Sequence, residues 1–119
     1  MAVLTCRAGE LERQYRALCT DIGLEYTAST ETESSDPTAE TLLMATAKDF
    51  KELQKVGNSI STDYLWLSME ENDETVTVFG EELPDDNIGL IVLVSAGGQN
   101  LLIYMEGGTS ILGKIHIGN

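Results

Sequence analysis

The chain has 119 residues, of which 42% are hydrophobic and 23% are charged, a composition typical of one folded domain. Twenty acidic residues against seven basic ones give a formal net charge of −13. This charge excludes nucleic acid and anionic lipid surfaces as expected partners, because both require Lys and Arg for docking.

The first predicted helix covers residues 8–22. Leu11, Tyr15 and Leu18 recur at the spacing of one helix face. Gly23 follows, and glycine commonly ends a helix in the left-handed conformation.

Residues 24–36 are rich in Ser, Thr and Glu and contain few apolar side chains. This composition predicts a polar loop. The β-branched Thr residues leave a short edge strand through Tyr26 as the alternative.

A second helix is predicted from Asp36 to Gly57, so that the helical part of the chain covers about residues 8–57. Asp36 can accept hydrogen bonds from free backbone N–H groups, and Pro37 suits the first position of a helix. An apolar stripe at helical spacing is formed by Leu43, Ala47, Phe50 and Leu53.

From Asp63 onward the apolar pattern changes to a period of two, which predicts a strand meander over about residues 63–117. Residues 90–94 are apolar on both faces, so we expect the most buried strand there. Gly97-Gly98 predicts a tight hairpin turn, and the acidic stretches 70–74 and 82–87 predict further turns. The last segment, residues 110–117, reads as a strand or a short helical turn.

Together these elements predict an α+β fold in a single domain, residues 1–119. In this prediction two N-terminal helices pack on one face of a four- to five-stranded antiparallel meander.

The two cysteines, Cys6 and Cys19, have neither a C-x-x-C spacing nor a nearby histidine. A disulfide between them and a buried free thiol at Cys19 are both open interpretations. We interpret them as structural rather than catalytic.

No catalytic, metal or nucleotide motif is recognisable. His116 is the single histidine and lacks Cys or His partners nearby, so we interpret it as a solvated edge residue. The acidic turns do not match a calcium-binding loop, and the glycine pairs do not match a phosphate-binding loop. We therefore predict no catalytic residue, metal ligand or cofactor, and a protein that is not an enzyme.

The candidate site residues are four aromatic side chains that could form a partner-binding patch on an exposed face of the sheet: Tyr64, Trp66, Phe79 and Tyr104. The alternative is that the helices cover this face and the aromatic residues serve packing.

Three segments, 74–80, 88–94 and 100–107, carry a family resemblance. They read Glu-Thr-Val-Thr-Val-Phe-Gly, Ile-Gly-Leu-Ile-Val-Leu-Val and Asn-Leu-Leu-Ile-Tyr-Met-Glu-Gly. This part resembles the C-terminal strands of the DUF4252 family, small exported proteins or lipoproteins of Bacteroidetes. The lysines common around the family's strands are missing, and Leu4-Thr5-Cys6 resembles its lipid-attachment signal only in part. The resemblance implies an extracytoplasmic address and offers no catalytic residues.

The functional hypothesis is a non-enzymatic acidic module that binds a protein or a basic ligand, exported or associated with the cell envelope. The alternative is a cytosolic acidic partner protein, such as a secretion chaperone or inhibitor. The longest aliphatic run, residues 90–94, is too short to span a membrane. Residues 1–5 are too short for a signal peptide, so an exported protein would be present here in its mature form or in a trimmed form. A lipid anchor is possible in the natural precursor. We expect a monomer or a homodimer.

Overall fold

The computed structural model describes residues 9–33, 36–84 and 86–108. Within these ranges it describes the side chains of all residues except 28–41. Within these ranges the chain forms two helices, α1 (Glu10–Ile22) and α2 (Phe50–Ser59), and a short 3-10 turn, η1 (Thr62–Tyr64). The same ranges hold six strands: β1 (Tyr26–Glu33), β2 (Asp36–Thr46), β3 (Leu65–Glu71), β4 (Glu74–Leu83), β5 (Asn87–Ala96) and β6 (Gln99–Gly108). Cys6, His116 and the predicted last segment, 110–117, lie outside the described residues.

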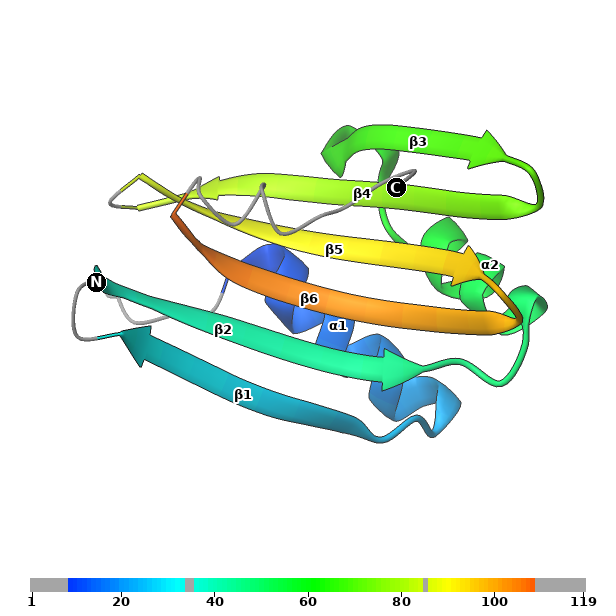
Figure 1. Ribbon diagram of the computed structural model, residues 1–119, viewed down its shortest axis with the longest axis horizontal. Helices are drawn as coiled ribbons and strands as arrows, with labels where there is room; N and C mark the ends of the chain where they lie inside the picture. The colour runs from blue at the N-terminus through cyan, green and yellow to red at the C-terminus, as the bar shows by residue number, and fades with distance from the viewer. Residues whose placement is uncertain (1–8, 34–35, 85, 109–119) are drawn as a thin grey trace.

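All six strands form one antiparallel sheet in the order β1-β2-β6-β5-β4-β3. The link between its two halves is the pairing of β2 with β6, from Thr41 opposite Glu106 to Thr46 opposite Leu101. Both helices lie on the same face of the sheet, behind it in the view of Figure 1. The predicted combination of helices with an antiparallel sheet is therefore confirmed.

The predicted four- to five-stranded meander behind two consecutive N-terminal helices is wrong. The sheet has six strands in the described part of the chain, and the β1–β2 hairpin separates the two helices along the sequence. The predicted helix start at Asp36 is in fact the start of β2. Most of the predicted polar loop, 24–36, is β1, which is the strand alternative extended over residues 26–33.

The misplaced helix has a physical explanation in the spacing of its apolar residues. Leu43 and Ala47 are four positions apart, and two residues so separated share one face in a helix and also in a strand. In the structure Leu43, Ala45 and Ala47 are buried while Met44 and Thr46 are exposed, which is the alternation of a strand. Pairing with β6 therefore overrides the helix-forming tendency of the Leu and Ala residues.

The second helix begins at Phe50 and is capped by Asp49 instead of Asp36. Asp49 Oδ1 accepts a hydrogen bond from the Glu52 N–H at 2.9 Å. In return, Glu52 Oε1 accepts one from the Lys48 N–H at 2.9 Å, just before the helix. The two side chains thus satisfy backbone donors that the first turn of a helix leaves free.

The predicted first helix is confirmed, and it ends at Gly23 with a left-handed φ of 76°. Its buried face consists of Leu11, Tyr15 and Cys19. The Tyr15 hydroxyl donates a buried hydrogen bond to the Leu102 carbonyl oxygen at 2.8 Å, which ties α1 to the centre of the sheet.

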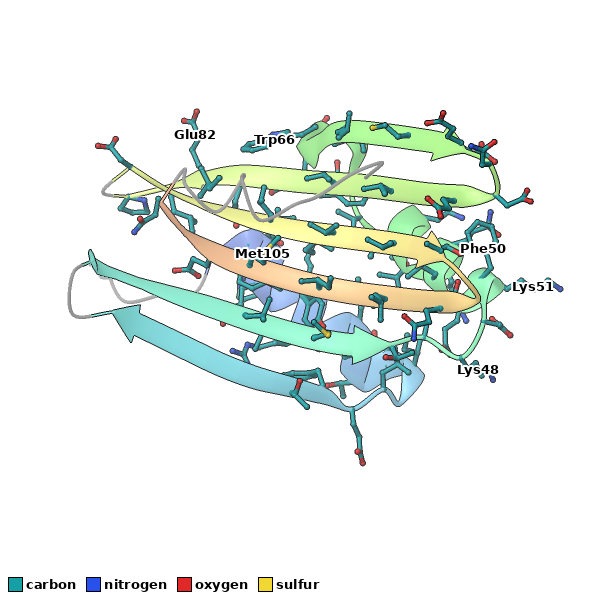
Figure 2. The ribbon with its side chains drawn as sticks, viewed as in Figure 1. Lys48, Phe50, Lys51, Trp66, Glu82 and Met105 are labelled. Carbon is teal, nitrogen blue, oxygen red and sulfur yellow. The ribbon has the colours of Figure 1, made fainter. Side chains whose placement is uncertain are left out.

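Apolar side chains gather on both faces of the sheet. The helix-side cluster includes Phe79, Ile91, Leu93, Leu102 and Tyr104 together with the buried faces of α1 and α2. The cluster on the opposite face consists of Val78, Ile88, Leu90 and Val92, bordered by half-buried residues such as Met105, which Figure 2 shows near the middle of this face.

The strand predicted to be most buried, residues 90–94, is the middle of β5, and residues 88–93 are buried without interruption. The Gly97-Gly98 hairpin is also confirmed, with φ of 59° and 80° at the two glycines. No helix in the described residues is long and apolar enough to cross a membrane.

Replacing the cap residue, Asp49→Ala, should lower the free energy of unfolding by about 1 kcal/mol, because the Glu52 N–H loses its acceptor. Urea denaturation followed by circular dichroism measures this loss. Lys51→Ala, at an exposed position of the same helix, is the matched control and should leave stability almost unchanged. Equal stability of both variants would contradict the assignment of Asp49 as the cap.

Candidate functional site

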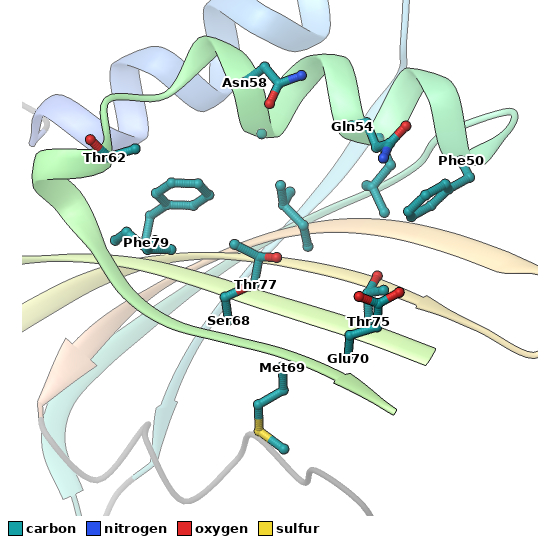
Figure 3. Close-up of a pocket in the computed structure, with 14 residues that line it drawn as sticks. Phe50, Gln54, Asn58, Thr62, Ser68, Met69, Glu70, Thr75, Thr77 and Phe79 are labelled. Atoms are coloured by element: carbon teal, nitrogen blue, oxygen red, sulfur yellow. The ribbon is translucent and has the colours of Figure 1, made fainter. Parts of the chain in front are cut away.

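A cavity of about 390 Å³ lies between α2 and the β3–β4–β5 part of the sheet. Figure 3 shows α2 above this space and the strands below it. Phe50, Leu53, Gln54, Gly57 and Asn58 contribute to its lining from α2. The remaining lining residues come from η1 and the three strands: Thr62, Leu65, Ser68, Met69, Glu70, Thr75, Thr77, Phe79 and Leu93.

The cavity exists because the sheet presents small side chains under the helix. Ser68, Thr75 and Thr77 lie where larger apolar residues would fill the space between the layers. At Gly57 the helix approaches the sheet closely, since a Cβ there would be 3.2 Å from Leu93 Cδ1. Close packing at one point and short side chains beside it leave an open pocket.

The lining combines apolar walls, from both the sheet and α2, with a polar rim. Phe79, Leu93 and Leu53 are buried members of the helix-side cluster. The amides of Gln54 and Asn58 and the hydroxyls around them offer both donors and acceptors. Among the described lining residues Glu70 is the single charged one, so the cavity favours neutral or positively charged groups.

β3 borders this cavity and, among the strands that the structure describes, is the outermost on that side of the sheet. Three consecutive large apolar residues at its start are exposed: Leu65 by 40%, Trp66 by 46% and Leu67 by 38%. The register between β3 and β4 shifts between Leu65 and Leu67, so Trp66 occupies a bulge. Its indole lies against Gly80, where a Cβ would overlap the ring.

The structure does not bring the four predicted patch residues together. Phe79 and Tyr104 are buried on the helix side of the sheet, and Tyr64 is half-buried against the same cluster. Trp66 lies over Gly80 at the start of β3 (Figure 2) and keeps a large exposed surface. A partner-binding role for these residues stays a prediction, and a partner could reach Trp66 directly.

Sequence reasoning missed the cavity residues of α2. Gln54 and Asn58 lie four positions apart, on the side of the helix that carries Phe50 and Gly57. The signal was present as a polar pair at helical spacing beside an apolar stripe. It was missed because the predicted helix ended at Gly57 and left Asn58 outside, whereas α2 continues to Ser59.

A group of carboxyl side chains lies at the N-terminal end of α1, next to Tyr104. Glu81 Oε2 accepts a hydrogen bond from the Leu11 N–H at 2.9 Å and thereby caps α1 from the sheet. Glu106 Oε1 accepts one from the Tyr104 hydroxyl at 2.9 Å, and Glu12 pairs with Arg16 at 2.8 Å.

Burial raises the pKa of the Glu106 carboxyl above its ordinary value, and the nearby Glu12 and Glu81 charges raise it further, against the lowering effect of the Tyr104 hydrogen bond. Burial likewise raises the pKa of the Tyr104 phenol. No group of three or more His, Cys, Asp or Glu in the described residues could hold a metal ion.

Cys19 is a buried free cysteine, and burial raises the pKa of its thiol. A thiol of this kind is a poor nucleophile. Its predicted alternative, a bridge to Cys6, involves a residue outside the described part of the chain.

The stability of the protein should depend on the protonation of Glu106. Because its pKa in the folded state lies above the unfolded value, its contribution is present at a pH below the unfolded pKa and is lost as the pH rises through the folded pKa. Glu106→Gln removes this titration. We expect the free energy of unfolding of the variant, relative to the original protein, to increase as the pH rises from about 4.5 upward.

Urea denaturation of both proteins over a series of pH values measures this difference. Glu82→Gln, at an exposed position of β4, controls for the loss of one negative charge. A difference that stays constant with pH would show that Glu106 titrates alike in the folded and unfolded chains.

Comparison with known proteins finds no matching family model, no matching curated protein and no matching solved structure. The DUF4252 resemblance therefore stays a prediction that rests on the strand pattern. The functional argument rests on the residues of the cavity and of the β3 edge.

Proposed function

We propose that the protein is a non-enzymatic binding module. Its cavity between α2 and β3–β5 takes a ligand that has an apolar body and a positively charged group. The observation that carries this proposal is the composition of the lining. Apolar walls, formed by Phe79 and Leu93 of the sheet and Leu53 of α2, meet a rim of neutral polar side chains and one carboxylate, Glu70.

The size of the cavity supports ligand binding. At about 390 Å³ it falls in the range of small-molecule pockets, which are roughly 300–1,000 Å³ and combine apolar walls with a few polar groups that fix orientation. The exposed ring of Phe50 and the amide of Gln54 lie at the lining contributed by α2, where they could contact the body of a ligand.

Charge supports a basic ligand. The turn between β3 and β4 is exposed, and Asp73 in the turn and Glu71 and Glu74 on either side of it lie next to Glu70, which lines the cavity. This acidic turn adds to a net charge of −13, so the field near the cavity attracts cations and repels anions.

The lining also supports binding over catalysis. Its described residues include no histidine, cysteine or lysine, and Glu70 is the only carboxylate among them. General acid–base or nucleophilic catalysis normally places a second ionisable group within hydrogen-bond reach of the first. The extracytoplasmic address and the cytosolic chaperone alternative both stay predictions, and cavity binding is compatible with either.

A pair of probes that differ only in charge tests the proposal. Phenylbutylamine and phenylbutyrate share one apolar body, and amide chemical shifts in NMR spectra report where each binds. The amine should shift the amides of Ser68, Thr75 and Thr77, while the carboxylate should shift them much less. Absence of shifts at these residues with the amine, or equal shifts with both probes, would contradict the proposal.

Two variants sharpen the experiment. Thr77→Leu fills the cavity and should abolish the shifts, whereas Thr46→Leu, at an exposed position of β2, should leave them unchanged. Glu70→Gln should reduce the preference for the amine by about two- to fivefold, the size expected for one partly exposed ion pair.

A further inference from the structure

The outer edge of β3 has no neighbouring strand in the part of the chain that the structure describes. An edge strand presents a row of unpaired N–H and C=O groups that can pair with another extended segment. The position of β3 at the top of the sheet in Figure 1 leaves this edge at the border of the molecule's described part.

The turn after β3 determines which backbone groups point outward. Asn72 and Asp73 form the two-residue turn with φ of 54° and 67°, so the flanking pair, Glu71 and Glu74, is hydrogen-bonded. Hydrogen-bonded and non-hydrogen-bonded pairs alternate along an antiparallel ladder. The N–H and C=O groups of Ser68 and Glu70 therefore point away from β4, toward the free edge.

This edge is only partly protected against pairing. Proteins commonly place charges, proline or a bulge on an exposed edge strand. β3 has a bulge at Trp66 and the acidic residues Glu70 and Glu71 at its end, which would repel an acidic segment but not a basic one. At its start, Leu65, Trp66 and Leu67 leave large apolar surfaces exposed. The opposite edge strand, β1, has the polar sequence Tyr-Thr-Ala-Ser-Thr-Glu-Thr-Glu.

The free edge and the cavity are adjacent, because Ser68 and Glu70 belong to both. They line the cavity on the helix side of the sheet, and Figure 3 shows Met69, which lies between them, pointing to the other side. Side chains of an added strand would alternate in the same way. Every second one would therefore lie at the cavity, next to Glu70.

Charge decides between the occupants of this edge. A second copy would bring another net charge of −13 against the acidic β3–β4 turn, and this repulsion opposes self-association. A basic segment meets the same turn with opposite charge. The edge geometry favours an extended segment, and the charge favours a basic one.

We propose that a partner protein binds here through an extended basic segment, which adds to the sheet along β3 and places an apolar or basic side chain in the cavity. Main-chain hydrogen bonds to Ser68 and Glu70 provide the affinity, and the cavity provides the selectivity. This inference rests on the proposed function and names the partner that the cavity serves.

Synthetic peptides test strand addition. The probe is an acetylated, amidated peptide of alternating Lys and Val, compared with its Glu and Val counterpart. Trp66 is the only tryptophan of the chain, so its fluorescence reports binding beside the edge. The Lys peptide should bind and the Glu peptide should not. N-methylation of one alternating set of peptide amides should weaken binding about tenfold or more, whereas methylation of the other set should not.

A backbone variant tests the same contact from the protein side. Ser68→Pro removes one outward N–H and leaves the ladder to β4 intact. Ser68→Ala keeps that N–H and measures the effect of losing the side chain alone. We expect the proline variant to bind the peptide about tenfold more weakly than Ser68→Ala, with circular dichroism confirming the fold of both. If Ser68→Pro does not fold, the methylated peptides decide the question by themselves.

The outcomes separate this inference from the proposed function. Strand addition is overturned, and the cavity function stands, if phenylbutylamine binds in the cavity but the Lys peptide does not bind. The same conclusion follows if neither set of methyl groups weakens binding of the Lys peptide. Failure of both probes overturns both. Light scattering that shows a homodimer, dissociated by Ser68→Pro, would assign the edge to a second copy and overturn the basic partner.

Discussion

The pairing of β2 with β6 is the contact on which the rest of the structure depends. It joins residues 41–46 to residues 101–106 and so connects the N-terminal hairpin to the four C-terminal strands. It also buries Leu43 and Ala45 beneath the helices, beside Leu102 and Tyr104. β2 ends at this pairing, and α2 begins a few residues later and contacts β5 and β6. Residues of α2 also line the cavity over β3, β4 and β5.

This contact also explains which parts of the fold could be predicted from the sequence. α1, the buried strand at residues 90–94 and the Gly97-Gly98 hairpin depend on short-range patterns, and all three were predicted. The strand from Asp36 to Thr46 depends on a partner about sixty residues away, and its Leu and Ala spacing fits a helix equally well. Local pattern reading therefore gave the wrong element there, and the strand count followed it.

The candidate site shows a similar division. Trp66 was predicted as a surface candidate and is exposed, whereas Phe79 and Tyr104 are core residues, because strand alternation places them on the side covered by the helices. The cavity could not be predicted, since it depends on the approach of α2 at Gly57 and on three short side chains that come from two strands. The acidic turn beside it was visible in the sequence, and the structure places it next to an open sheet edge.

Amide hydrogen exchange on the complex with the basic peptide tests the central claim, that this open edge and the cavity form one binding site. The N–H groups of Ser68 and Glu70 should exchange rapidly in the free protein and become protected when the peptide binds. Those of Leu67 and Met69 already bond to β4 and should change little. Protection confined to α2 or to the Trp66 side of the sheet, with Ser68 and Glu70 unchanged, would contradict the account.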